Sequence, residues 1–190
     1  RLTVQVDRVL SGKDPLGGGR LEATLENGRA EIGPVEVRIP GGSARLALGY
    51  EPTDTDVRVD TRIDVERFDY GILARRIKPE TDFRGQFSLR MDVNSRARYL
   101  SDILKSGTGR IEFAVWPENM RAGIFDLWAV NLLMALVPAV DPGGASKINC
   151  ALGRFELKDG HLVDRTIVMD TSRMRVSGHG RADFRDEEVA

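Results

Sequence analysis

The stretch VRVDTRIDV, residues 57–65, decides the fold class of this chain. Its odd positions hold only Val, Thr or Ile, and its even positions hold only Arg or Asp. Strict alternation with a period of two places these sets on opposite faces of a β-strand, one apolar and one charged. The stretch therefore predicts a strand whose charged face is solvated. We interpret its Arg and Asp residues as cross-strand ion pairs rather than as a catalytic carboxylate cluster.

The same alternation recurs on both sides of this stretch. Between the recurrences, Asn27-Gly28 predicts a tight hairpin turn, and Gly33-Pro34 shifts the alternation by one residue, which predicts a bulge or a bend. We expect a mainly β fold with helices (α+β), built on a long curved antiparallel sheet of about ten strands. The strand-like runs cover residues 2–6, 21–25, 30–39, 44–50, 57–65, 87–93 and 111–115, followed by a closing meander over 148–157, 162–171 and 174–184.

Three segments depart from strand alternation and predict helices. Residues 123–140 (GIFDLWAVNLLMALVPAV) are apolar on nearly every side, which is typical of a buried helix. Asp126 and Pro138 argue against a membrane span, which needs about 20 predominantly apolar residues. Residues 68–77 and 96–105 predict two short helices. We expect these one long and two short helices to cover part of the apolar inner face of the sheet.

Composition places the chain among folded proteins. It has 190 residues, of which 41% are hydrophobic and 30% charged, and its net charge of -1 argues against nucleic acid as a partner. No segment is long enough to be a linker, so we expect one domain over residues 1–190. The chain opens at Arg1 within a strand, and we expect it to be a fragment of a longer protein.

Few residues offer catalytic or metal-binding chemistry. Cys150 with His161 or His179 could supply a nucleophile and a base, but Cys150 lies in an alternating strand, where a lone Cys is usually a small buried hydrophobe. Two histidines and one cysteine match no zinc spacing. The acidic loop at 51–56 lacks the Gly and the distant Glu of an EF-hand. We therefore expect no enzyme activity, no metal site and no cofactor.

The order of several short motifs resembles a known family. They are residues 39–46 (IPGGSARL), 85–89 (GQFSL), 148–150 (INC), 155–160 (FELKDG), 168–171 (VMDT) and 176–184 (VSGHGRADF). In this order they resemble the carboxy-terminal periplasmic region of AsmA-like proteins of Gram-negative bacteria, which are related to bacterial bridge-like lipid transfer proteins. The resemblance implies a periplasmic body, anchored in the inner membrane by an amino-terminal helix outside this chain. It also implies phospholipid transport toward the outer membrane and outer-membrane biogenesis, with no catalytic residues.

We therefore expect a non-enzymatic segment that shelters phospholipid acyl chains in an apolar β-groove, with other envelope proteins as further candidate partners. Each sheltered methylene contributes about 0.8 kcal/mol without directed chemistry. Two alternatives stay open: each groove candidate can equally be core beneath the helices, and the whole chain can be a structural or protein-binding β-domain with a closed core. The groove candidates are Leu46, Leu48, Val57, Val59, Ile63, Phe87, Leu89 and Met91.

Overall fold

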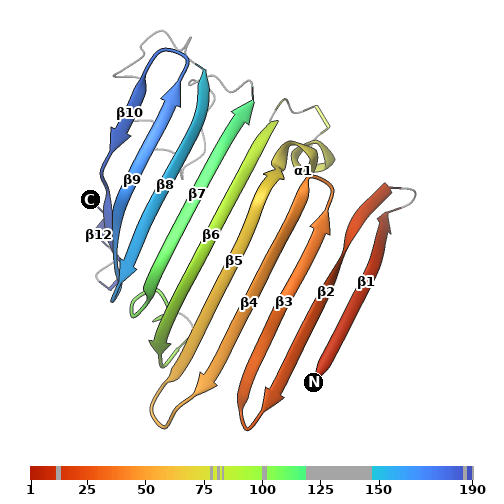
Figure 1. Cartoon of the computed structure of the whole chain (residues 1–190), viewed down its shortest axis with the longest axis vertical. Coiled ribbons are helices and arrows are strands. Elements are labelled where there is room, and N and C mark those ends of the chain that lie inside the picture. Colours follow the sequence, from red (N-terminus) through yellow and green to blue (C-terminus); the bar gives the residue numbers. More distant parts are fainter. Residues whose placement is uncertain are drawn as a thin grey trace.

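A computed structural model describes residues 1–11, 14–77, 79–80, 82, 84–99, 102–118, 147–185 and 188–189. Within these ranges the strands form one open antiparallel sheet (Figure 1). The first nine strands neighbour one another in chain order, and β9 then pairs with both β10 and β11. The strands are β1 (Leu2–Ser11), β2 (Asp14–Glu26), β3 (Arg29–Ile39), β4 (Gly42–Pro52), β5 (Val57–Asp69), β6 (Arg84–Ala97), β7 (Thr108–Glu118), β8 (Ile148–Lys158), β9 (His161–Thr171), β10 (Arg175–Gly178), β11 (Arg181–Asp183) and β12 (Glu188–Val189).

The two predicted irregularities near the start of the sheet are confirmed. Asn27 and Gly28 connect β2 to β3 with φ values of 51° and 81°, as a two-residue primed turn requires. In the pairing of β3 with β4, the register shifts between Ile32 and Val35. Gly33-Pro34 fills this gap and has a cis peptide bond. The turn sets the register of β2 against β3, and the register shift keeps the apolar residues of β3 on one face.

The apolar positions of successive strands fall beside one another. Leu46 pairs with Ile63, Ile63 with Met91, Met91 with Ile111, and Ile111 with Phe155, so one apolar row crosses β4 to β8. Because side chains alternate between faces, the residues two positions along each strand extend this row into a continuous surface. We call this surface the apolar face.

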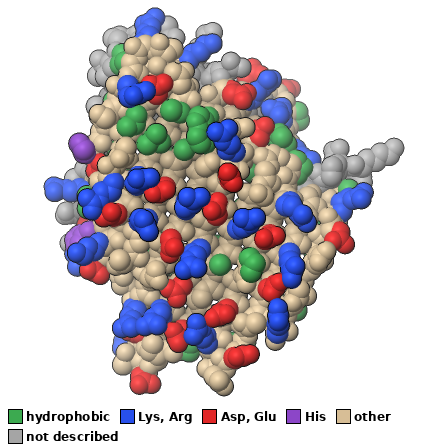
Figure 2. Space-filling model, in the orientation of Figure 1, with side chains coloured by type: hydrophobic (Ala, Val, Ile, Leu, Met, Phe, Trp, Pro, Cys, Tyr) green, Lys and Arg blue, Asp and Glu red, His purple; other side chains and the backbone are tan. Residues whose placement is uncertain are grey.

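The opposite surface, the charged face, carries ion pairs between strands. The Arg90 Nε atom lies 3.5 Å from an Asp64 carboxylate oxygen, and the Arg62 Nε atom lies 3.4 Å from one of Asp92. Figure 2 shows this face, on which basic and acidic side chains are interspersed over most of the strands. The predicted cross-strand pairing of the Arg and Asp residues is thus confirmed. Exposed pairs of this kind contribute only about 0–1 kcal/mol each.

One predicted short helix is present and begins slightly later than expected. It is α1 (Tyr70–Ile77). Phe68 and Asp69 still pair with Phe87 and Gln86 of β6, which keeps them in β5. The Asp69 carboxylate accepts a hydrogen bond of 3.2 Å from the backbone N–H of Ile72 and so caps the first turn of the helix.

The other predicted short helix, over 96–105, is wrong. Residues up to Ala97 belong to β6, because Ala97 pairs with Val57 in the ladder. Residues 102–107 then form successive tight turns, with hydrogen bonds of 3.0 Å from the Lys105 N–H to the Asp102 carbonyl and 3.3 Å from the Gly107 N–H to the Leu104 carbonyl. The predicted long helix at 123–140 lies outside the described residues. Among the described residues α1 is the one α-helix, so the expected cover of three helices is not borne out.

The last predicted strand, 174–184, is divided in two. β10 pairs with Ile167–Asp170 and β11 with His161–Val163, both on β9. Between these ladders the Asp164 carboxylate accepts a hydrogen bond of 2.9 Å from the Gly180 N–H. The Asp164 N–H in turn donates a 3.2 Å hydrogen bond to the Gly180 carbonyl, so Asp164 contacts the chain at the break between the two ladders.

Candidate functional site: the apolar face

All eight groove candidates lie on the apolar face. Leu46, Ile63 and Met91 are direct neighbours in one row across β4, β5 and β6. The other five occupy adjacent rows: Leu48 faces Thr61, Phe87 faces Phe68, Leu89 faces Val65, Val59 faces Ser95 and Val57 faces Ala97.

Exposure divides the candidates. Leu46 exposes 38% of its surface, whereas Val59 exposes 2% and belongs to the core. The remaining six are intermediate in burial. Val59 shares this burial with Val93 and Leu157, each 1% exposed. Val59 therefore lies in the core and has almost no exposed surface to offer a ligand.

The core end of the apolar face is covered by residues 102–107, which we call the 102–107 turn. A Cβ atom at Gly107 would lie 2.7 Å from Cδ2 of Leu157 and 3.3 Å from Cγ1 of Val93, so the turn rests directly on both side chains. The Oγ atoms of Ser95 and Ser106 lie 2.9 Å apart and share a hydrogen bond. That bond explains why a serine, 4% exposed, is tolerated at an apolar-face position.

On the apolar face, the side chains that expose the most surface lie at the other end, on β1 to β4, and most of them were not among the candidates. The signal was present, since residues 2–6 and 21–25 alternate as regularly as 57–65. Alternation predicts the face but not what covers it, so it does not rank these residues by exposure. The exposed fractions are 55% for Leu2, 42% for Val4, 40% for Val6, 68% for Leu25, 38% for Val37, 38% for Leu46 and 37% for Tyr50.

The structure keeps Cys150 apart from His161. Cys150 pairs with Asp170 at the far end of β9 from His161, a distance of about 30 Å along the strand. The Nδ1 atom of His161 lies 2.9 Å from an Asp183 carboxylate oxygen. These two residues therefore do not form the nucleophile and base pair considered from the sequence.

His179 also has a carboxylate partner. Its Nδ1 atom lies 2.9 Å from an Asp164 carboxylate oxygen, and the Asp164 side chain is only 6% exposed. The hydrogen bond from the Gly180 N–H, followed by that from His179, holds the pKa of Asp164 below its ordinary value. In the same way the Arg185 N–H and the charge of His161 lower the pKa of Asp183. Both histidines thus contact carboxylates that fix the β9 to β11 junction.

Comparison with known proteins adds no relative. No family model matches the chain, and neither a curated protein nor a solved structure is significantly similar to it. Within the described ranges, no group of three or more His, Cys, Asp or Glu residues is placed to hold a metal ion, and no helix is long and apolar enough to cross a membrane. The AsmA-like resemblance therefore stays a prediction that depends on the sequence motifs.

Proposed function

We propose that the apolar face binds lipid acyl chains at its β1 to β4 end, as a non-enzymatic segment of an envelope protein. The observation that carries this proposal is the exposure of Leu2, Leu25 and Leu46 on one continuous face, at 55%, 68% and 38%. Monomeric proteins seldom expose contiguous apolar surface without an interaction that uses it.

The register supplies a track for an acyl chain. Leu2 pairs with Ala23, Ala23 with Ile32, Ile32 with Leu48, and Leu48 with Thr61. At about 4.8 Å per strand, this row extends about 19 Å across β1 to β5. A chain lying along it hides about half of its surface, which contributes about 0.4 kcal/mol per methylene. Several methylenes together therefore provide useful affinity without any polar contact.

The setting of this proposal comes from the sequence motifs. Their resemblance to AsmA-like proteins supports a periplasmic location, an inner-membrane anchor outside this chain, and phospholipid movement toward the outer membrane. A specific observation favours the alternative of a structural or protein-binding β-domain, namely the buried core around Val59, Val93 and Leu157. That core occupies one end of the apolar face, and the exposed leucines lie at the other.

A matched pair of variants on β4 tests the proposal. Leu46 and Ala47 are adjacent, but Leu46 lies on the apolar face and Ala47 on the charged face, opposite Arg62. The chain is produced in a bacterial periplasm, and native mass spectrometry with lipid extraction then measures co-purified phospholipid. Uptake of a fluorescent fatty acid measures binding to the same surface in solution.

We expect phospholipid at reproducible stoichiometry with the wild-type chain. Leu46→Asp should remove most of the phospholipid and of the fatty-acid uptake, because a carboxylate in the row must be desolvated by the ligand. Ala47→Asp should change neither. A folded, lipid-free wild-type protein that also takes up no fatty acid would contradict the proposal, as would equal losses in both variants.

A further inference from the structure

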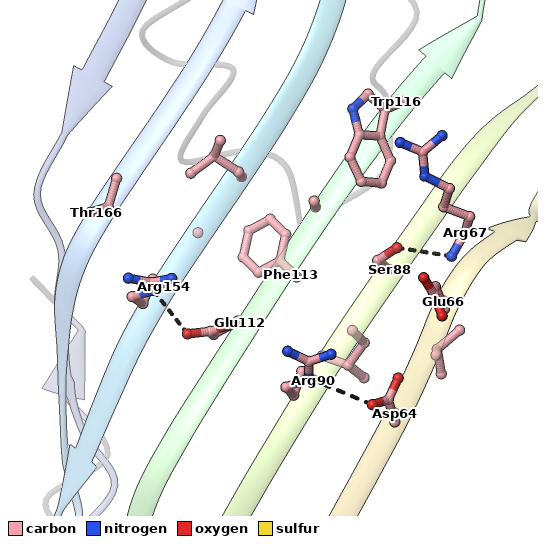
Figure 3. Close-up of a pocket in the computed structure, with 15 residues that line it drawn as sticks. Asp64, Glu66, Arg67, Ser88, Arg90, Glu112, Phe113, Trp116, Arg154 and Thr166 are labelled. Carbon is pink, nitrogen blue, oxygen red and sulfur yellow. Dashed lines mark hydrogen bonds and ion pairs between the residues drawn. The ribbon is translucent and has the colours of Figure 1, made fainter. Parts of the chain in front are cut away.

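A hollow of about 540 Å³ lies on the charged face, over β5 to β9 (Figure 3). Its floor is formed where the rows of ion pairs are interrupted. Ser88, Ala114 and Leu152 are neighbours on β6, β7 and β8, and none of them carries a charge. In Figure 2 hydrophobic side chains gather in the upper part of this otherwise charged face. We call this feature the Trp116 hollow, after the indole on its rim.

The rim of the hollow combines an aromatic ring with a cation. The guanidinium carbon of Arg67 lies 5.3 Å from the centroid of the Trp116 indole, within cation–π range. The two side chains come from β5 and β7 and lie side by side in Figure 3. Trp and Arg are among the residues most enriched at the binding hot spots of protein–protein interfaces.

An unusual backbone conformation places Arg67 on this rim. Its φ is 44°, in the left-handed region that non-glycine residues seldom adopt. It lies in a β-bulge, where the register of β5 against β6 shifts between Val65 and Phe68, and its N–H donates a 2.9 Å hydrogen bond to Oγ of Ser88. Bulges redirect side chains, and a strained residue beside a cavity is a reason to look for a ligand.

Arg67 is also the cation of the hollow that lacks an acidic partner. Arg90 is engaged by Asp64 at 3.5 Å, and Arg154 by Glu112 at 2.8 Å. Arg67 forms no ion pair with any other described residue. One free guanidinium matches one carboxylate, which it can bind through two parallel N–H donors. A phosphate group carries more charge, and the two other arginines of the hollow that could balance it are already paired.

We propose that the Trp116 hollow binds a monocarboxylate with a compact apolar body. The body lies over Ala114 and Leu152 against the Trp116 indole, and the carboxylate is held by Arg67. The exposed Glu66 carboxylate, next to Arg67 in the chain, weakens the attraction and limits affinity. The ligand is either a free organic acid or the terminal carboxylate of a peptide, since both present this chemistry.

Indole NMR tests the proposal directly. The chain has two tryptophans, Trp116 and Trp128, so a Trp128→Phe background leaves the Trp116 Nε1–H resonance as the reporter. The probes are 3-phenylpropionate, its neutral amide, phenyl phosphate, and an N-acetylated Ala-Ala-Phe peptide with a free terminal carboxylate. We expect a saturable shift with 3-phenylpropionate, affinity at least roughly tenfold weaker with the amide, and no gain with phenyl phosphate. Tighter binding of the peptide than of the free acid would identify the peptide as the source.

Charge variants separate the guanidinium from the rest of the hollow. Arg67→Gln should lower the affinity for 3-phenylpropionate by roughly tenfold. Glu66→Gln should raise this affinity by roughly twofold, because a repulsive charge is removed. Arg45→Gln is the matched control, since Arg45 is an exposed arginine of the same face paired to Glu36 at 3.4 Å. It should bind as the wild type does.

Two further variants exclude a folding artefact. Arg67→Gly relieves the positive φ, so it should keep or raise the melting temperature while it loses binding. Ala114→Val raises the floor beneath the proposed apolar body and should weaken binding while the Arg67 side chain stays in place. The proposal is overturned if no probe gives a saturable shift, or if the amide and Arg67→Gln bind as well as the acid and the wild type.

Discussion

The two ends of the apolar face differ in what covers them. On β1 and β2, Leu2 and Leu25 expose 55% and 68% of their surface, whereas Val93 on β6 and Leu157 on β8 expose 1% each. The strands that carry them alternate equally regularly, and they belong to the same sheet. At the buried end the 102–107 turn lies on the side chains. The difference teaches that alternation specifies a face, while what covers that face decides which part of it becomes core.

This division separates stability from binding. Side chains hidden beneath the 102–107 turn contribute their full burial to folding, and those at the β1 to β4 end contribute much less. The same exposed residues keep their apolar surface for a ligand. Truncation of a leucine should therefore change the stability little at the β1 to β4 end and greatly beneath the 102–107 turn.

The largest expected effect contrasts these two ends directly. Leu157→Ala should lower the free energy of unfolding by about 2–5 kcal/mol, because it leaves a cavity beneath the 102–107 turn. Leu25→Ala should change it by less than about 0.5 kcal/mol, since Leu25 is largely exposed. Urea unfolding followed by circular dichroism measures both. Equal losses would show that the two ends share one core.

Gly107→Ala tests the covering turn itself. The added Cβ would lie 2.7 Å from Cδ2 of Leu157 and 2.9 Å from the carbonyl oxygen of Ile103, so the turn must lift. We expect a loss of about 1–3 kcal/mol in the free energy of unfolding. Lifting the turn should also expose Val93 and increase fatty-acid uptake, which would make the covered end resemble the open one.

Gly178→Ala is the control for that change. A Cβ at Gly178 meets no atom within 4 Å, so its effect should stay within about 0.5 kcal/mol. A stable Gly107→Ala variant with unchanged uptake would mean that the 102–107 turn is not what closes the apolar face.

Much of the fold is predictable from local sequence. The period of two over 57–65 and the Asn27-Gly28 turn depend on neighbouring residues, and both predictions are confirmed. The helix predicted over 96–105 is wrong because its apolar spacing fits a helix, while its first residues pair with the start of β5, far back in the sequence. The division of 174–184 depends equally on a long-range contact, between Asp164 and Gly180.

The site was predictable only in part for the same reason. Alternation placed all eight candidates on one face, but it does not indicate that Val59 is only 2% exposed. The Trp116 hollow was missed altogether. It depends on the contact between Arg67 on β5 and Trp116 on β7, with β6 between them. Nothing in the sequence around either residue indicates this contact. The sequence pattern predicts the elements, but it does not predict which side chains of different strands come into contact.

The two halves of the sheet should also differ in how their stability responds to acid. This is the smallest and most local of the expected effects. At the β9 to β11 junction the Gly180 N–H and His179 lower the pKa of Asp164, and neighbouring contacts lower that of Asp183. A carboxylate with a lowered pKa stabilises the fold above its ordinary value of about 3.9, and this contribution is lost as the pH falls through the lowered pKa. On β3 and β4 the Arg45 to Glu36 pair is exposed and contributes little.

Hydrogen exchange at pH 5 and pH 3, expressed as protection factors, measures this difference. We expect protection of the β11 amides of Arg181–Asp183 to fall at pH 3, while the amides that join β3 and β4 keep theirs. Asp164→Asn should lower the protection of the β11 amides already at pH 5, because the charged acceptor of the Gly180 N–H is gone. It should also remove most of the difference in protection between pH 5 and pH 3. If β11 and β3 lost protection together, acid would be acting on the whole sheet, and the carboxylate at Asp164 would not be what holds its last ladder in place.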